Sequence, residues 1–168
     1  MEDVLIVDGY NVLNGWPELN KVKEESLEHA REKLIDILSE YSALKGVQVI
    51  VVFDGQMVKG GIRNAQFISG IEVIYTNEGE TADSVIEKLM HQLPSNLLAA
   101  VATSDWDEQK IVLGKGAIRM PVRELREQAL ALEKDVQKFY HVGKQKTDLL
   151  EARIENKVRA VLEKWRRQ

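Results

Sequence analysis

The stretch VLIVDGYN, residues 4–11, decides the fold. Its first four residues are apolar, and most are β-branched, which predicts a short strand buried on both faces. The strand runs directly into an aspartate, a glycine and an asparagine. Because a buried carboxylate without a partner is costly, Asp8 needs partners from elsewhere in the chain. The stretch therefore predicts a buried strand whose end carries a site.

The rest of the chain alternates strands of the same kind with helices. Continuously apolar strands between helices predict an α/β fold with a parallel sheet covered on both faces. Further strands are predicted at residues 47–53, 71–75 and 97–102, helices at 18–44 (ended by Gly46), from Thr81 to about Leu93, from about 105 to 113 and from Pro121 onward, and a loop at 56–70.

Length and composition indicate one globular domain with an appended element. The chain has 168 residues, of which 44% are hydrophobic and 30% charged, and it has no cysteine. Disulfides, cysteine-zinc sites and thiol nucleophiles are thereby excluded. No signal peptide or transmembrane run is recognised. We expect a cytoplasmic protein with no membrane partner, and the sequence predicts no oligomeric state.

The net charge of −4 argues mildly against a nucleic-acid partner, but the charge is unevenly distributed. Residues 110–126 and residues 144–168 each carry a net charge of +4. A basic face beside an acidic body is one interpretation. Solvated helix faces with no partner are the other, and the counts leave both open.

Three of the predicted strands lead into an acid: Asp8, Asp54 and Asp105. The carboxyl ends of parallel strands meet at one edge of the sheet, with neighbours about 4.8 Å apart. A fourth acid, Asp83, lies in the first turn of a predicted helix and shares a face with Glu80. Each aspartate alone is also typical of a turn or a helix cap. The set together predicts a carboxylate cluster.

Such a cluster needs a counter-charge, because carboxylates this close cannot all stay ionised unaided. Oxygen ligands without cysteine favour Mg²⁺ or Mn²⁺ over Zn²⁺. The amide of Asn11 can hold a carboxylate or a phosphate oxygen, or belong to a plain turn. Tyr10, Trp16 and Trp106 flank the acids and can stack on bases or pack in the core.

Carboxylates that hold Mg²⁺ at a sheet edge suit phosphoryl transfer. The chain has no GxxxxGK[ST] motif and no GxGxxG after a strand, so no nucleotide cofactor is expected. No Ser/His/Asp arrangement or GxSxG motif is present. A metal-dependent hydrolase of phosphodiesters remains.

The motifs VDGYN, VVFDG, ETAD and TSDWDEQ occur in this order and spacing. Together they resemble the NYN branch of the PIN-like metal-dependent nucleases. More narrowly, the chain is similar to the YacP-like family of bacterial ribosome-associated endoribonucleases, over about residues 1–126 and more loosely beyond. The resemblance implies a PIN-like (NYN) three-layer α/β domain with a central, mainly parallel sheet at residues 1–140. A basic C-terminal helix is expected at residues 141–168.

The resemblance also implies an activity: cleavage of single-stranded RNA, dependent on Mg²⁺ or Mn²⁺, with mRNA as substrate and the ribosome as partner, hence a role in mRNA decay. The implied catalytic residues are Asp8, Asn11, Asp83 and Asp105. The implied metal ligands are Asp8, Asp54, Asp83 and Asp105, with Glu80 and Asp107 as neighbours that act through water. Basic residues expected to contact RNA or the ribosome are Lys59, Arg63, Lys115, Arg119 and Arg123.

Two other functions stay open. A non-catalytic RNA- or ribosome-binding module of the same fold is the main alternative, although the intact acids argue against it. A phosphohydrolase of small substrates is the second, and the basic, glycine-rich segment at residues 56–70 fits it poorly. Chelation by EDTA separates the first alternative from a nuclease, because only the nuclease needs a metal.

Overall fold

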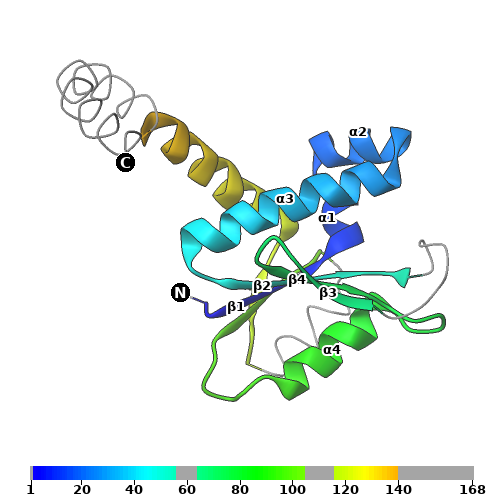
Figure 1. The fold of residues 1–168 in the computed structure, drawn as a ribbon. Helices are drawn as coiled ribbons and strands as arrows, with labels where there is room; N and C mark the ends of the chain where they lie inside the picture. Colours follow the sequence, from blue (N-terminus) through cyan, green and yellow to red (C-terminus); the bar gives the residue numbers. More distant parts are fainter. Residues whose placement is uncertain (1, 56–63, 105–115, 140–168) are drawn as a thin grey trace, which may run out of the picture. The chain divides into compact units, whose positions relative to one another are not determined.

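The computed structural model describes residues 2–55, 64–104 and 116–139 (Figure 1). The chain separates into a unit that ends at Ala129 and a second that begins at Leu130. The predicted domain boundary at residue 140 lies outside the described residues. The elements are β1 (Val4–Asp8), α1 (Gly9–Gly15), α2 (Pro17–Glu25), α3 (Leu27–Lys45), β2 (Gln48–Phe53), β3 (Asn64–Ile68), β4 (Ile71–Tyr75), α4 (Ala82–Gln92), β5 (Ala99–Ala102) and β6 (Ile118–Met120).

The described strands form one sheet in the order β3-β4-β2-β1-β5-β6. β1 lies inside the sheet and pairs in parallel with β2 and β5. β4 and β6 extend the parallel part, and only β3 runs antiparallel, at the edge. Asp8 pairs in register with Val52, so the ends of β1 and β2 lie side by side. The predicted α/β fold with a mainly parallel sheet is confirmed.

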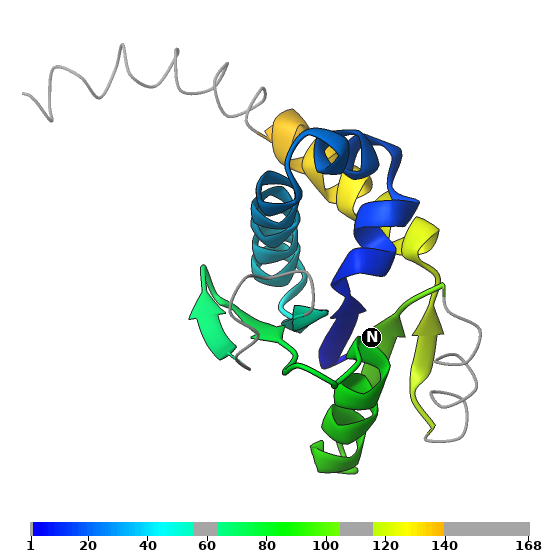
Figure 2. The ribbon, with the colours of Figure 1, turned by 90° about the vertical axis from the view of Figure 1, so that its right-hand side faces the viewer.

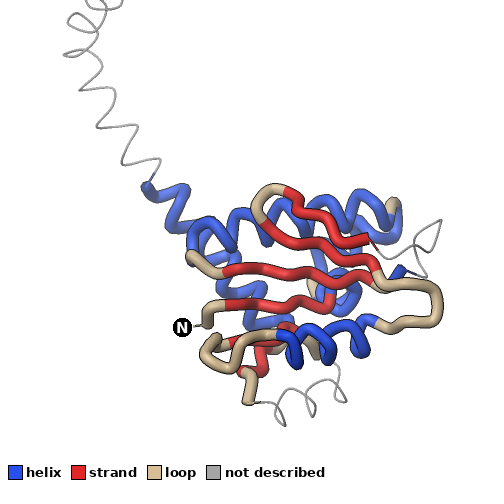
Figure 3. Tube along the Cα trace, turned by 60° about the horizontal axis from the view of Figure 1, so that its bottom comes forward, coloured by secondary structure: helices blue, strands red, loops and turns tan. Residues whose placement is uncertain are grey.

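Helices cover both faces of the sheet and form three layers (Figures 1 and 2). α4 packs on one face, with α1 and α3 on the other, and Figure 3 shows α4 in front of the strands. Alternate strand residues face α4, as the two-residue period requires. Val4 and Ile6 of β1 lie in this layer with Val85 and Ile86 of the helix, all nearly inaccessible to water. Their burial stabilises the position of α4.

The helix predicted at residues 18–44 is two helices, because Ser26 ends one and begins the next. Its side chain accepts a hydrogen bond from the His29 amide (3.2 Å) and caps α3. Serine competes for backbone groups in this way at helix ends. The predicted end at Gly46 is confirmed.

The prediction of a loop at residues 56–70 is wrong for the second half of this range, where β3 forms a hairpin with β4. Ser69 and Gly70 connect the strands with positive φ angles of 50° and 86°, as in the mirror-image turns that suit hairpins. Phe67 is 76% exposed, so the strand lacks the buried alternation by which strands are recognised. The three-residue strand β6 also escaped prediction. Residues 56–63 and the helix predicted at 105–113 lie outside the described residues.

Residues 122–129 of the first unit and residues 130–139 of the second are helical, as predicted from Pro121 onward. Within the first unit, Trp16 donates its Nε1 hydrogen to the Val122 carbonyl (2.7 Å) and anchors α1 to this helix. None of the helices in the described residues is long and apolar enough to cross a membrane.

Candidate functional site

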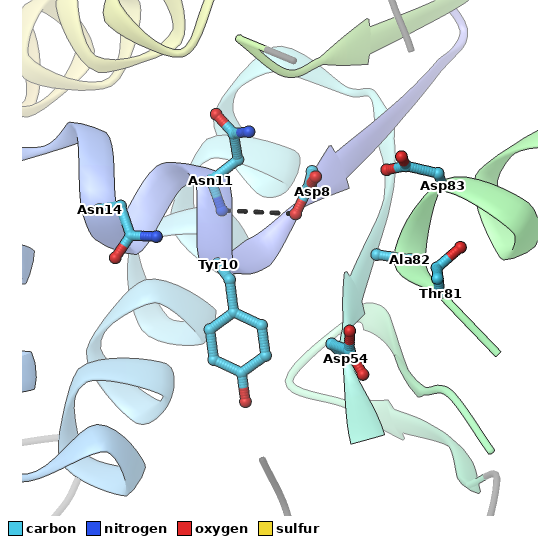
Figure 4. Close-up of a pocket in the computed structure, with 8 residues that line it drawn as sticks. All are labelled: Asp8, Tyr10, Asn11, Asn14, Asp54, Thr81, Ala82 and Asp83. Carbon is cyan, nitrogen blue, oxygen red and sulfur yellow. Dashed lines mark hydrogen bonds between the residues drawn. The ribbon is translucent and has the colours of Figure 1, made fainter. Parts of the chain in front are cut away.

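A pocket of about 380 Å³ opens at the carboxyl ends of β1 and β2 (Figure 4). It brings together three of the predicted acids, one each from β1, the end of β2 and the first turn of α4. The predicted Asn11 lies in the same wall. The described residues that line it are Asp8, Tyr10, Asn11, Asn14, Asp54, Thr81, Ala82 and Asp83.

Asp8 ends β1 and begins α1. The residue is 7% exposed, and its carboxylate accepts a hydrogen bond from the Asn11 backbone amide (3.3 Å), so it caps the helix (Figure 4). The amide compensates part of the cost of burying the charge. The interpretation of Asp8 as a cap is therefore confirmed, and the same residue lines the pocket.

Asp54 is positioned by a buried hydroxyl that the sequence did not single out. Thr76 has no exposed surface. Its hydroxyl donates a hydrogen bond to Asp54 Oδ1, with 3.4 Å between the two oxygens. The same hydroxyl accepts from the Gly55 amide (2.8 Å) and lies 3.3 Å from the Glu80 carbonyl. One side chain thus joins the end of β2 to the segment that leads into α4.

Gly55 allows this close approach. A Cβ atom at position 55 would lie 1.8 Å from the Thr76 carbonyl oxygen, far inside contact distance. Only glycine fits the observed backbone there. The signal in the sequence was an Asp-Gly pair directly after a strand, together with a threonine directly after the next parallel strand.

Asp83 reaches the pocket from the first turn of α4, where it is half-buried. The helix begins with a capping box: Thr81 accepts from the Ser84 amide (3.2 Å), and Ser84 accepts from the Thr81 amide (3.3 Å). The helix predicted from Thr81 to about Leu93 is confirmed, with Thr81 as its N-cap. The paired caps fix where the helix begins and hence where Asp83 lies.

Glu80 is not among the described residues that line the pocket, and both oxygens of its carboxylate make contacts elsewhere. Oε1 accepts from the Asn77 amide (3.1 Å), and Oε2 forms an ion pair with Lys88 (3.1 Å). These contacts brace the turn before α4. The structure therefore shows a bracing contact for Glu80, while the action through water stays a prediction.

Asn11 uses its side chain on the other side of β1. Its Oδ1 accepts from the Ser104 backbone amide (3.0 Å) and from the Ser104 hydroxyl. The side-chain oxygen of Asn11 therefore holds the chain that follows β5, and its contact with a carboxylate or a phosphate stays a prediction. Asp105 comes directly after Ser104, but Asp105 and Asp107 lie outside the described residues.

The donor set of the pocket fits a hard divalent cation. All its ligating groups are carboxylate, amide or hydroxyl oxygens, and no lysine or arginine is among the described lining residues. Within residues 2–55, 64–104 and 116–139, no three acids or histidines lie close enough to form a ready-made metal cage. Mg²⁺ typically takes one or two carboxylates and completes its shell with water and substrate phosphate. The pocket matches that open arrangement.

The three flanking aromatic residues differ in their surroundings. Trp16 is 1% exposed and fully engaged in the core, so it cannot stack on a base. Tyr10 is half-buried and lines the pocket. Burial raises its pKa, against the opposing effect of the hydrogen bond from Arg31. Trp106 lies outside the described residues.

Of the predicted basic contacts, the structure describes two. Arg119 lies on β6 and Arg123 on the following helix, where it pairs with Glu127 (3.3 Å). Both side chains are exposed, and neither lines the pocket. Lys59, Arg63 and Lys115 lie outside the described residues, so most of the predicted basic surface stays a prediction.

Comparison with known proteins identifies the family of this chain. The model of the YacP-like NYN domain, a nuclease-type domain, matches residues 5–167. YacP of Bacillus subtilis (strain 168) is 40% identical over 167 residues, which cover 98% of this chain and 97% of the relative.

Solved structures agree with this match. The crystal structure of Rae1 (YacP) from Bacillus subtilis matches with a TM-score of 0.76 and 38% identity, over 99% of this chain and 95% of that one. A single-substitution variant of Rae1 matches with a TM-score of 0.69 and 39% identity, over 81% and 79% of the two chains. The predicted NYN fold is confirmed.

Proposed function

Because this chain belongs to the YacP-like NYN domain family, we propose that it is an endoribonuclease dependent on Mg²⁺ or Mn²⁺. Its substrate is single-stranded RNA, specifically mRNA on the translating ribosome in the cytoplasm. The observation that carries the proposal is the convergence of Asp8, Asp54 and Asp83 on one pocket. These carboxylates come from three separate elements of the fold, namely β1, the end of β2 and the first turn of α4.

The charge of the pocket explains why a cation belongs to the proposal. Three carboxylates repel a phosphodiester, so RNA can enter only when positive charge is held between them. Asp8, Asp54 and Asp83, joined by Asp105 after Ser104, would hold the cation, one or two of them directly and the others through bound water. When bound, the cation would supply an activated water and neutralise the phosphate. The carboxylates, which are attached to fixed elements of the fold, would orient the cation, its water and the phosphate.

The proposed chemistry sets the form of the products. In-line attack of water on phosphorus expels the ribose 3′ oxygen and leaves a 5′-phosphate and a 3′-hydroxyl. No histidine is among the described residues lining the pocket, so attack by the 2′-hydroxyl has no evident acid–base pair. Detection of 2′,3′-cyclic phosphate ends would contradict the mechanism.

The first prediction concerns Asp8→Asn and Asp83→Asn, assayed on a short single-stranded RNA with Mg²⁺. We expect each variant to lose about 100-fold or more in cleavage rate. Asparagine still caps helices, so α1 should persist, and lower repulsion should leave thermal stability in EDTA unchanged or higher. The measurements are rates of RNA cleavage and melting temperatures.

The matched control is Asp36→Asn, which removes an exposed carboxylate of α3 outside the pocket. It should cleave at the wild-type rate. If Asp83→Asn also cleaves at that rate, the pocket is not the active site. If the wild-type protein does not cleave RNA and EDTA leaves its RNA or ribosome binding intact, the protein is a binding module.

Ribosome association is tested separately, by incubating the protein with translating ribosomes and mapping new mRNA 5′ ends. Phosphate contacts from Lys59, Arg63, Lys115, Arg119 and Arg123 would position RNA or ribosome without reading sequence. The association of the protein with RNA or the ribosome should weaken steeply as the salt concentration rises. Cuts that appear only on free RNA would remove the ribosome from the proposal.

A further inference from the structure

Tyr10 stands at the boundary between the core and the pocket. It follows Asp8 by two residues on α1 and lines the same cavity as the carboxylates (Figure 4). Tyr10 is half-buried, whereas Trp16, on the same side of the sheet, is 1% exposed and donates its indole N–H to a backbone carbonyl. Trp16 is therefore a core residue, while Tyr10 offers part of its ring to the cavity.

Two contacts fix the orientation of the Tyr10 ring. It packs edge-on against Phe53, with ring centroids 5.5 Å apart and an interplanar angle of 64°. Its hydroxyl accepts a hydrogen bond from Arg31 Nη1 (3.1 Å). Phe53 is itself fully buried and stacks on Tyr75, with centroids 5.6 Å apart. The ring is thus preorganised, and a ligand that contacts it does not have to order it.

The pocket needs a neutral contact of this kind. Asp8, Asp54 and Asp83 give the cavity negative charge, so a nucleic acid gains nothing from bare phosphate contacts at this wall. An aromatic ring can instead stack on a base of any identity, because every base has a π face. A base can reach a ring inside a cavity only when it has left a helical stack. The contact therefore selects single strands.

We propose that Tyr10 stacks on the nucleobase that flanks the phosphodiester held at the carboxylates, and so makes the site selective for single-stranded RNA. The proposal rests on the proposed nuclease function and adds a base-binding subsite to it. Arg31 and Phe53 act as positioning residues behind the ring. The occupant is a base, and sequence selectivity is not expected at this contact.

The test combines a change in the protein with a change in the RNA. Binding is measured by fluorescence anisotropy with Mg²⁺ at low salt, in an Asp83→Asn background that prevents cleavage. The probes are a short labelled RNA and versions with an abasic nucleotide at each position in turn. With Tyr10 present, one abasic position should weaken binding about 10-fold. With Tyr10→Leu, the intact RNA should bind about 10-fold more weakly, and that abasic position should cost nothing further.

Three variants separate stacking from a structural role. Tyr10→Phe keeps the ring and should bind within about 2-fold of the parent. Tyr75→Leu removes a ring from the same aromatic cluster but not from the pocket lining, and should keep the abasic effect. If Tyr10→Leu does not fold, Tyr10→Met replaces the ring with a side chain that adapts to irregular gaps.

The proposal is overturned if Tyr10→Leu and the parent respond equally to abasic substitution at every position, or if neither binds RNA. Cleavage by the protein with Asp83 intact is scored independently. A protein that shows the base effect but never cleaves keeps the subsite and loses the nuclease. One that cleaves and ignores every abasic position keeps the nuclease and loses the subsite.

Discussion

The segments on the two sides of β1 that border the pocket are held in place in different ways. On the β2 side, Thr76 joins Asp54, the Gly55 amide and the Glu80 carbonyl, and the backbones are in direct contact. On the β5 side, one amide oxygen, Asn11 Oδ1, holds Ser104. The first side is held by several contacts that support one another, whereas on the second the described side-chain contact is that of Asn11 with Ser104. Substitutions on the first side should therefore lower the stability of the fold. Substitutions on the second side should mainly lower the cleavage rate.

Gly55→Ala should have the largest effect, because the added Cβ meets a backbone oxygen that cannot move without shifting β4. We expect the free energy of unfolding to fall by about 3 kcal/mol or more, measured by urea denaturation. The control is Gly79→Ala, where the added Cβ has open space and only the positive φ of 83° is strained. That variant should lose about 1 kcal/mol. Equal losses would show that the β2 side is not held by close packing.

Thr76→Val should have the next largest effect. Valine keeps the shape but removes the hydroxyl, which leaves the Gly55 amide without this acceptor in a buried setting. The expected loss is about 1–3 kcal/mol in the free energy of unfolding. Cleavage should fall as well, because Asp54 loses the group that orients it. Thr76→Ser retains the hydroxyl and should restore most of the cleavage rate, whereas a failure of serine to do so would assign Thr76 to packing alone.

Asn11→Ala should have the smallest effect on stability. Ser104 is exposed, so water can replace the lost hydrogen bonds, and the loss should stay below about 1 kcal/mol. Cleavage should nevertheless fall, because the chain that enters Asp105 is released. The control is Asn14→Ala, which lines the same pocket but bonds only to Lys23 among its described partners. If both variants cleave RNA equally well, the β5 side does not depend on Asn11.

The sheet and its acids were predictable because their causes are local and repeated. Continuously apolar segments such as residues 4–7 and 49–53 specify buried parallel strands, and parallel strands place their ends together. Asp8 and Asp54 follow two such neighbouring strands and therefore share an edge, and the helix predicted from Thr81 carries Asp83 in its first turn. Asp8, Asp54 and Asp83 could therefore be found in the sequence without a structure.

The remaining features depend on contacts or on exposure that the spacing of apolar residues does not show. Thr76 looks like any threonine after a strand, and its role follows from its contacts with Gly55, 21 positions away, and with Glu80. The bond from Asn11 to Ser104 spans 93 positions. Strand β3 escaped prediction because Phe67 faces outward, so burial supplies no alternation. The apolar spacing predicted one continuous helix, which Ser26 divides into two.

The Thr76 hydroxyl has one hydrogen and two acceptors within reach, Asp54 Oδ1 at 3.4 Å and the Glu80 carbonyl at 3.3 Å. A hydroxyl turns about a single bond, so it behaves as a two-position rotor. When a ligand in the pocket takes over the Asp54 oxygen, the hydrogen can turn toward the carbonyl, and no buried donor is stranded. The wall of the pocket can thus exchange one set of hydrogen bonds for another without any movement of its backbone.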